Sequence, residues 1–412
     1  MSEWHDHRLG DNVSPLSGFP FSSSAFSNEN GFPLIRIRDL LDGKTELKYS
    51  GKFEKSYVIK ADDVLIGMDG DFHLVKWKGQ EALLNQRILK LIENRQSELC
   101  LDFLFYWLAP FLIKVNEQTA ATTVKHLSTF DVVNAIVHAP AYEQQEKIAK
   151  ILSTVDSLIG KTQSLIDKYT AVKQGMMADL FTRGIDLTPG DNYGQLRPSA
   201  TEAPELYQQT ELGWVPKDWE VLPLQKLAQK IQDGTHFSPV TGSGDYLYLT
   251  SKNIRFGYLT LENIETISKE QHISIHKRCD VRKGDLLLTK DGANTGNAAI
   301  NDIAEQFSML SSVAFIRSNE LSKEDYLLHY ILSDIAQSRI KDAMSGNAIT
   351  RLTLEKINSF TVPVPPITEQ RLITDKLNAL KNTIDDEKIY LEKLKLQKKG
   401  LMQDLLTGKV RV

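Results

Sequence analysis

The side chains that offer chemistry in this sequence are mainly forked donors and amides at predicted strand ends and loops. Arg and Lys suit the acceptors of guanine, Asn and Gln pair bidentately with adenine, and other positive groups bind phosphates without specifying sequence. In the first half of the chain, the residues with this potential are Arg36, Arg38, Lys76, Lys78, Asn85, Gln86, Arg87, Lys125 and His126. In the second half they are Thr235, His236, Lys252, Asn253, Arg255, Lys290, Asn294, Thr295, Asn297, Asn347 and Arg351.

Two clusters in the second half are typical of a nucleic-acid contact surface. Lys252-Asn253-x-Arg255 ends a predicted strand, as Arg36-x-Arg38 does in the first half. The run Gly292-Ala293-Asn294-Thr295-Gly296-Asn297 places amides beside two glycines, which let a backbone approach a ligand closely. For any one of these residues the alternative is a solvated surface charge or a turn former. Asn85-Gln86-Arg87 is equally well explained as a structural element, because apolar residues flank it.

Residues with the spacing of a catalytic or nucleotide site are not evident. Gly160-Lys161-Thr162 resembles the end of a phosphate-binding loop, but Val155 stands where that loop requires glycine. The Asn-Pro-Pro-Tyr or Asp-Pro-Pro-Tyr type motif of an amino-methyltransferase is missing, as are Gly-x-Ser-x-Gly and His-Glu-x-x-His. Asp63 and Asp285 precede apolar strands and are more simply turn residues than a pair of catalytic acids. We expect no catalytic residue in this chain.

Metal and disulfide chemistry are not expected either. Cys100 and Cys279 are far apart in sequence and outside any C-x-x-C pattern, which argues against a disulfide framework and a zinc site. His5 and His7 are close together, but we interpret them as solvated side chains near the terminus.

The sequence contains an internal repeat: the segments expected to position these residues occur twice, about 225 residues apart. A repeat of this kind indicates the architecture of the whole chain. The paired segments occur in the same order in both halves, which chance similarity explains poorly. They are residues 174–182 with 399–407, 139–144 with 365–370, 63–70 with 285–292, 32–38 with 246–252, and Trp4 and Leu9 with Trp219 and Leu224.

Each repeat ends in a long helical stretch. No proline interrupts residues 142–182, and apolar residues recur at the ~3.5-residue spacing that favours coiled-coil packing, a register that the second copy keeps. We expect an antiparallel pair made by the two helices of one chain; core helices of a single domain, or pairing with another copy, are the alternatives. A helix of this length is a rod of roughly 60 Å, suited to place two readers on successive turns of DNA. The expected seam residues are Ile148, Leu152, Val155, Ile159, Ile166 and Tyr169, with Leu377, Leu380, Ile384, Leu391 and Leu394.

The chain is therefore predicted to be an α+β protein in which two long helices join two globular domains, with an internal pseudo-twofold repeat. Short β-branched runs, turn signals and amphipathic helical stretches at 99–114 and 323–344 support this class. The segment between the two repeats is rich in Pro, Gly, Thr and polar residues, a composition that predicts a linker. The expected boundaries are 1–140 for the first domain, 141–185 for the first helix, 186–218 for the linker, 219–364 for the second domain and 365–412 for the second helix.

Composition limits the class of protein. The length of 412 residues suits two or three domains, and 41% apolar with 25% charged residues describes an ordinary soluble chain. A polar start and the lack of an apolar run near ~18 residues predict a cytoplasmic protein without signal peptide or membrane span. The net charge of −4 argues against a lone, tight, non-specific nucleic-acid binder. It is compatible with a subunit whose partners supply part of the positive surface.

With these features in place, the sequence resembles the specificity subunit of type I restriction-modification systems over essentially its whole length. The second half opens with Thr-Glu-Leu-Gly-Trp-Val-Pro-Lys-Asp-Trp-Glu at residues 210–220, and Gly-Leu-Met-Gln-Asp-Leu-Leu-Thr-Gly ends at Gly408. Leu84-Asn85-Gln86-Arg87 and the Pro-x-x-Glu-Gln motif before both helices also fit that family.

The resemblance implies a non-catalytic DNA-recognition subunit in which each of two target-recognition domains reads one half of a bipartite site. Two conserved helices would set the spacing between the halves and help to anchor partners. The implied partners are double-stranded DNA, two methyltransferase (modification) subunits and restriction subunits, with no membrane. S-adenosylmethionine, ATP and Mg are expected on those partner subunits, and no cofactor on this chain. A self-contained modification or restriction enzyme and a coiled-coil scaffold are the alternatives.

Overall fold

The computed structural model describes residues 4–119, 125–242, 244–344 and 351–412. Contacts divide the chain into two compact units, which we call the first unit (Met1–Gln163 with Ile389–Val412) and the second unit (Ser164–Lys388). Each unit holds one globular repeat and a part of both long helices. None of the helices in the described ranges combines the length and the apolar character that a membrane span requires.

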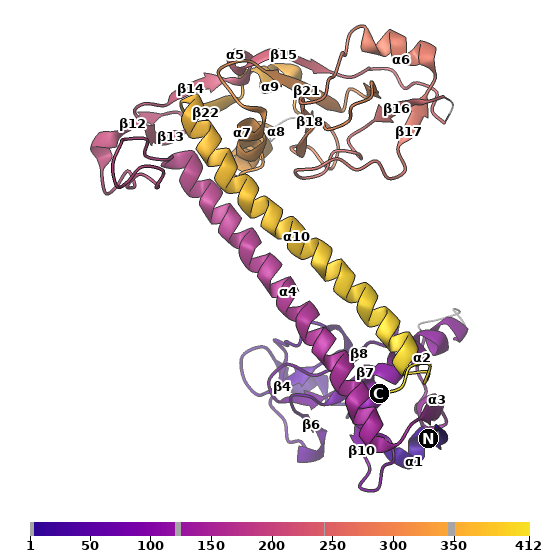
Figure 1. Cartoon of the computed structure of the whole chain (residues 1–412). Coiled ribbons are helices and arrows are strands. Elements are labelled where there is room, and N and C mark those ends of the chain that lie inside the picture. Colours follow the sequence, from indigo (N-terminus) through magenta and orange to yellow (C-terminus); the bar gives the residue numbers. More distant parts are fainter. Residues whose placement is uncertain (1–3, 120–124, 243, 345–350) are drawn as a thin grey trace. The chain divides into compact units, whose positions relative to one another are not determined.

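The globular part of the first unit holds two larger β-sheets and the antiparallel pair β1-β11 (Figure 1). One larger sheet is antiparallel in the order β2-β10-β7-β8; the other has the order β3-β5-β4-β9-β6 and contains a parallel contact between β4 and β9. The strands of the first unit are β1 (His5–Arg8), β2 (Val13–Ser17), β3 (Phe26–Ser27), β4 (Phe32–Ile35), β5 (Lys48–Tyr49), β6 (Val58–Ile59), β7 (Val64–Gly67), β8 (Leu74–Lys76), β9 (Ala82–Leu84), β10 (Ile88–Glu93) and β11 (Ile136–Ala139). Its shorter helices are α1 (Leu9–Asn12), α2 (Leu101–Gln118) and α3 (Thr129–Val133), with 3₁₀ turns η1 (Ser23–Ala25), η2 (Ile37–Asp39) and η3 (Lys55–Tyr57).

The second unit repeats this plan. An antiparallel sheet has the order β15-β21-β18-β19, a smaller sheet has the order β17-β16-β20 with β16 parallel to β20, and two further pairs are β14-β22 and β12-β13. Its strands are β12 (Tyr207–Thr210), β13 (Gly213–Pro216), β14 (Glu220–Pro223), β15 (Ala228–Asp233), β16 (Tyr246–Leu249), β17 (Glu265–Ile267), β18 (Leu286–Thr289), β19 (Ala298–Ile300), β20 (Ser308–Met309), β21 (Val313–Ser318) and β22 (Thr361–Val364). Its shorter helices are α5 (Leu224–Leu227), α6 (Lys269–His276), α7 (Glu324–Ile331), α8 (Asp334–Met344) and α9 (Leu354–Ser359), with the 3₁₀ turn η4 (Pro204–Leu206).

The central strands β7 and β18 show how sequence dictates this plan. Val64 and Ile66 face a core shared with α2, whereas Leu65 faces the core that holds Leu84 of β9. In the second unit Leu286 lies in one core and Leu287 in another. A strand covered on both faces reads as a continuous apolar run rather than an alternating one, as both segments do. The Asp before each run accepts a backbone N–H from three residues earlier, so both acids serve turns as predicted.

The long helices are α4 (Tyr142–Thr182) and α10 (Ile367–Leu405), and they run antiparallel (Figure 1). In the first unit, Leu152 near the start of α4 shares a core with Leu405 at the end of α10. In the second unit, Leu180 near the end of α4 shares a core with Leu377 near the start of α10. The α+β class and the antiparallel helix pair are confirmed. Among the expected seam residues, Ile159, Tyr169 and Leu380 are half-buried, and the fully buried ones are Ile148, Leu152, Val155, Ile166, Leu377, Ile384, Leu391 and Leu394.

The register of the repeat at the helix starts differs by one residue from the sequence pairing. The side chain of Gln145 donates to the carbonyls of Pro140 and Glu98 and accepts from the amide of Cys100. Gln370 makes the same set of bonds to Pro365, Leu321 and Lys323. Residue 145 therefore corresponds to 370, and the pairing of 139–144 with 365–370 is wrong. The sequence pairing was shifted by one residue because the second copy has two consecutive prolines, at 365 and 366, and only Pro365 corresponds to Pro140.

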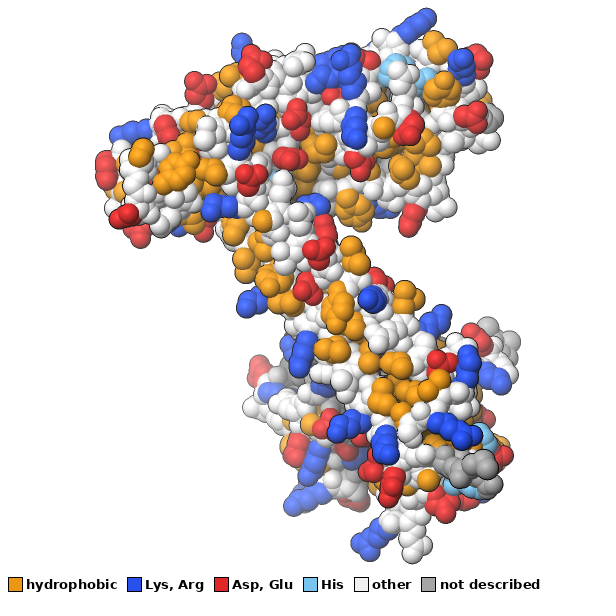
Figure 2. Space-filling model, in the orientation of Figure 1, with side chains coloured by type: hydrophobic (Ala, Val, Ile, Leu, Met, Phe, Trp, Pro, Cys, Tyr) orange, Lys and Arg blue, Asp and Glu red, His pale blue; other side chains and the backbone are white. Residues whose placement is uncertain are grey.

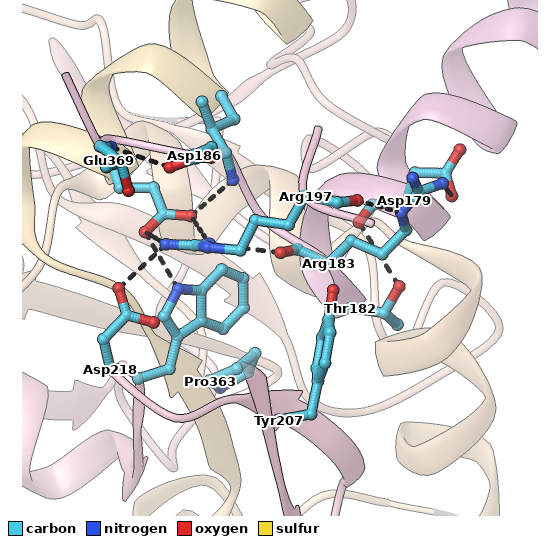
Figure 3. Close-up of polar contacts among 12 residues, drawn as sticks. Asp179, Thr182, Arg183, Asp186, Arg197, Tyr207, Asp218, Pro363 and Glu369 are labelled. Atoms are coloured by element: carbon cyan, nitrogen blue, oxygen red, sulfur yellow. Dashed lines mark hydrogen bonds and ion pairs between the residues drawn. The ribbon is translucent and has the colours of Figure 1, made fainter. Parts of the chain in front are cut away.

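The segment predicted as a linker is ordered and attached to the second unit (Figure 3). Arg197 donates to both carboxylate oxygens of Glu369 in the first turn of α10, at 2.5 and 3.0 Å, and to Asp218 at 2.9 Å. Glu369 is fully buried and also accepts from Trp219 Nε1 and from the amide of Ile185. A buried carboxylate requires such partners. The linker is therefore held at the point where α4 ends and α10 begins.

Candidate nucleic-acid interface

A parallel strand contact in the first unit brings two distant segments to one edge. Leu34 and Ile35 of β4 pair with Leu83 and Leu84 of β9, so Arg36 and Asn85 leave the sheet side by side. The residues that follow line an open hollow of about 590 Å³. We call this lining the first reading edge: Arg36, Ile37, Arg38, Leu41, His73, Asn85, Gln86 and Arg87. Five side chains predicted from the sequence are thereby gathered at one place.

Some of these side chains are fixed and others are free. Arg36 Nε lies 3.2 Å from Asp39 Oδ2, and Arg87 NH1 lies 3.3 Å from Asp69 Oδ1. Arg87 has φ +75°, a backbone conformation that costs energy for a non-glycine residue. By contrast, Arg38 and Gln86 are exposed, and their side chains make no hydrogen bond or ion pair within the described ranges. Guanidinium groups held by carboxylates, together with unbonded exposed donors, are suited to reading base edges and holding phosphates.

The remaining predicted residues of the first unit are placed differently. Lys76 Nζ pairs with Asp102 of α2 at 2.7 Å, and Lys125 Nζ donates to the carbonyl and side-chain oxygens of Asn116 near the end of α2. Both lysines therefore support α2. Lys78 is exposed, outside the lining of the first reading edge. His126 joins the edge indirectly, because its Nδ1 lies 2.7 Å from Asp69 Oδ1, the same oxygen that Arg87 contacts.

The second unit has an edge of the same construction. The isolated bridge between Phe19 and Asn85 corresponds to one between Thr235 and Leu310, and the pairing of Leu249 with Met309 corresponds to that of Ile35 with Leu84. We call the residues after β16 and β20, with the loops bonded to them, the second reading edge. Hydrogen bonds join these segments: Ser251 N donates to the side-chain Oγ of Ser312 at 3.3 Å, Lys290 N to Ser312 O at 2.8 Å, and Ser311 N to Thr235 O at 2.8 Å.

Sequence reasoning missed Ser311 and Ser312, which hold the places of Gln86 and Arg87 in the first unit. The correspondence follows from matched backbone bonds, in which Gln86 N and Ser311 N donate to Phe19 O and Thr235 O respectively. Small serines carry no signal on their own. Only the register of the short strand β20 could have revealed them, and two residues are too few to align.

A buried carboxylate organises the cations of the second edge. Asp233, which is 1% exposed, lies 3.4 Å from Lys290 Nζ, 3.2 Å from His236 Nε2 and 3.2 Å from Arg278 NH2. Lys290 is itself buried, whereas His236 and Arg278 are more than half exposed. Thr235, which lies between Asp233 and His236 in the chain, is buried. Asp233 therefore orients two cationic side chains and the His236 ring, a role that its place at the end of a mostly polar strand did not reveal.

The asparagines of the two predicted clusters are structural. Asn253 is 5% exposed; its Oδ1 accepts from the amide of Thr250 and its Nδ2 donates to the carbonyl of Thr260. Asn294 and Asn297 donate to the carbonyls of residues 251 and 254. These amides are used within the chain, and they fix the turn that presents Lys252 and Arg255 to solvent.

The other predicted residues of this half lie around the same turn. Thr295 caps its own loop by donating to the carbonyl of Gly292. Arg351 is exposed and forms a bridge with Asp291, as His126 does with Asp69 in the first unit. Asn347 lies outside the described residues.

Comparison with known proteins assigns the family. Residues 1–168 and 216–396 match the model of the type I restriction modification DNA specificity domain, and the chain belongs to this family. The type I restriction enzyme EcoBI specificity subunit of Escherichia coli is 29% identical over 391 residues, covering 90% of this chain and 78% of that protein. The MjaVIII specificity subunit of Methanocaldococcus jannaschii is 25% identical over 418 residues, covering 100% and 93%.

Solved structures share the fold. The type I restriction-modification S subunit from M. genitalium superposes with a TM-score of 0.63 at 16% identity, covering 98% of this chain and 96% of that chain. A chain from a type I R-M system, described for its complex assembly and conformational transition, gives 0.52 at 16% identity, covering 98% and 97%. The predicted family, fold and class of non-catalytic DNA-recognition subunit agree with these relatives.

Proposed function

We propose that the chain reads a bipartite DNA site, with the first reading edge contacting one half-site and the second reading edge contacting the other. The observation that carries this proposal is that both edges are built on the same parallel strand contact but carry different side chains. Arg87 in one unit stands where Ser312 stands in the other, and Met68 where Lys290 stands. Equivalent frames with different donors would read different bases.

We assign base and phosphate contacts to the groups that remain available at these edges. In the first unit they are Arg36, Arg38, Gln86 and Arg87, and in the second they are Lys252, Arg255, Ser312 and Arg351. The asparagines bonded within the chain (Asn253, Asn294 and Asn297) position the second edge without touching DNA. The length of the paired helices would set the number of unspecified base pairs between the half-sites.

The same proposal gives the helices a part in assembly with two methyltransferase subunits and with restriction subunits. Hydrophobic side chains are exposed along the helices (Figure 2). Ile389 and Leu396 are both 70% exposed, and Tyr390 is 44% exposed. Apolar groups left in water on a long helix favour packing against a partner. S-adenosylmethionine, ATP and Mg would be bound by those partners and not by this chain, and the complex would act in the cytoplasm.

The experiment that tests this function is to co-express the chain with a cognate methyltransferase subunit and to map methylated adenines by single-molecule sequencing. We expect a split motif, two specified blocks around a fixed gap, that disappears when the chain is omitted. Methylation that is absent, or unchanged without the chain, would favour the scaffold alternative. Methyl transfer by the purified chain alone would favour the enzyme alternative.

A further inference from the structure

An aromatic hollow of about 270 Å³ lies in the first unit, outside the first reading edge. Its lining consists of Phe19, Phe21, Lys52, Phe53, Glu54 and Tyr57. The Phe19 ring centroid lies 5.0 Å from that of Phe21 and 5.2 Å from that of Tyr57. Phe19 and Phe53 keep 43% and 37% of their surface exposed. A single exposed aromatic side chain is ordinary, but a group of them around one hollow marks a binding surface.

This hollow adjoins the first reading edge through the backbone. Phe19 forms a parallel bridge with Asn85, its amide donates to Leu84 O, and its carbonyl accepts from Gln86 N. Gly18 makes this contact possible, because a Cβ at residue 18 would lie 1.9 Å from Asn85 O. Backbone hydrogen bonds thus join the aromatic side of the hollow directly to the segment that carries Asn85 and Gln86.

The second unit keeps only part of this aromatic group at the equivalent place. Thr235 holds the position of Phe19, as the bridges Phe19–Asn85 and Thr235–Leu310 show, and it is buried. Phe237, two residues after Thr235 as Phe21 is after Phe19, is 53% exposed. The exposed ring bridged to the reading edge, that of Phe19, is therefore particular to the first unit.

We propose that this hollow binds a single nucleobase that has left the DNA stack, with Phe19, Phe53 and Tyr57 contacting its face. The inference rests on the proposed function, since it places the first reading edge on DNA. Bases inside a duplex hide their faces, whereas an unstacked base offers its face to aromatic side chains. A volume of about 270 Å³ is slightly below the ~300 Å³ at which pockets for drug-sized ligands begin, so it suits one base and not a base pair.

Charge at the rim favours DNA over the other occupant, an apolar side chain of a partner subunit. Lys52 is exposed and makes no ion pair within the described ranges, and it can contact the phosphate beside the extruded base. Glu54, which also lines the hollow and is exposed, can accept a hydrogen bond from a base edge. A docked apolar side chain would use neither group.

The test uses the full chain assembled with its methyltransferase subunits, bound to a duplex carrying the site found by methylation mapping. 5-Iodouracil replaces single bases of the first half-site, and the crosslinked residue is identified by mass spectrometry after irradiation. We expect crosslinks to Phe19, Phe53 or Tyr57 from one position, and a higher yield when the opposite nucleotide is abasic, because an unpaired base leaves the stack more easily. Crosslinks from no position to these residues would overturn the inference while leaving a mapped split motif intact.

Variants supply an independent readout. Wild-type complex should bind a site with one unpaired base at that position about tenfold more tightly than the paired site, and Phe53→Ala should abolish the preference while half-site dependence remains. Phe130→Ala is the control, since Phe130 is 71% exposed in the same unit and lies outside the hollow. Equal losses in both variants, or loss of a methyltransferase subunit from the Phe53→Ala complex, would overturn the assignment to a base. If DNA binding by the wild-type complex did not depend on the sequence of either half-site, the proposed function would be overturned together with the inference.

Discussion

Arg197 and Glu369 form a buried ion pair, with guanidinium nitrogens 2.5 and 3.0 Å from the two oxygens of a carboxylate that is fully buried. The arginine comes from the segment between the repeats, and the glutamate from the first turn of α10. In the first unit, Gln144 holds the place of Glu369, as the matched bonds of Gln145 and Gln370 establish. The carboxylate, Glu369, thus occurs in the unit where Arg197 is present to neutralise it, and the neutral amide, Gln144, occurs in the other.

Removing the arginine should destabilise the second unit strongly. Arg197→Met leaves a buried carboxylate without its cation, which costs about 3–5 kcal/mol. Asp218→Asn removes only the exposed partner of the same arginine and should cost under about 1 kcal/mol. Urea unfolding of the full chain measures both. Equal losses for the two variants would show that the buried pair contributes no more than the surface one.

Side chains at the second reading edge divide into readers and supports. Lys252→Ala with Arg255→Ala should weaken recognition of one half-site about tenfold or more, because a bidentate base contact contributes ~1–3 kcal/mol, and should leave the melting temperature unchanged. Asn253→Ala removes two bonds to the backbone and should lower the melting temperature instead. Binding competition with half-site variants and thermal melting separate these effects. Equal weakening of both half-sites by Lys252→Ala and Arg255→Ala would contradict the assignment.

The fold was predictable because its largest features are periodic. Two helical stretches without proline, one repeat order and two continuous apolar runs at β7 and β18 follow from side-chain type alone. The site was less predictable, because whether an amide reads DNA or holds a turn depends on tertiary contacts. Asn253 and Gln86 are both amides in turns, yet one is buried and bonded and the other is exposed.

Residues that organise the site from within were also beyond sequence reasoning. Asp233 ends an ordinary strand, and its effect arises only because Lys290, His236 and Arg278 converge on it in space. The aromatic wall at Phe19 is similar, since its rings come from separate loops. Convergence of distant segments is set by strand pairing, which propensities of single residues do not encode.

Acid should destabilise the second unit through His329 of α7. This side chain is 2% exposed, its Nε2 lies 2.7 Å from Asn378 Oδ1, and burial lowers its pKa to about 4. Above pH ~6.5 the histidine is neutral in both states; as the pH falls, the unfolded chain takes up the proton first, so stability is lost down to about pH 4, by up to about 3 kcal/mol. The variant His329→Gln should flatten this part of the stability curve. An unchanged slope between pH 6.5 and 4 would assign the acid sensitivity to other groups.

The exposed apolar residues of α10 should contribute to partner binding and not to folding. Replacing Ile389 and Leu396 by Ser should leave the melting temperature of the chain nearly unchanged, because both side chains are 70% exposed. The same variant should retain less methyltransferase subunit on co-purification, since the apolar contact area is lost. Replacing the exposed Lys393 by Ser in the same helix is the matched control. Full retention of the partner by the double variant would exclude this face as the docking surface.

Helix length should control the gap between the half-sites. Deleting one heptad from α4 and the facing heptad from α10 preserves the a/d register and removes a rise of about 10 Å from each helix. Because DNA rises ~34 Å per turn of ~10 base pairs, the unspecified gap should shorten by about three base pairs while both specified blocks stay the same. Methylation mapping of the deletion variant reads both quantities at once. Deleting four residues from α4 alone breaks the register and should abolish methylation. If the matched deletion altered a specified block, or left the gap unchanged, helix length would not be what sets the gap between the half-sites.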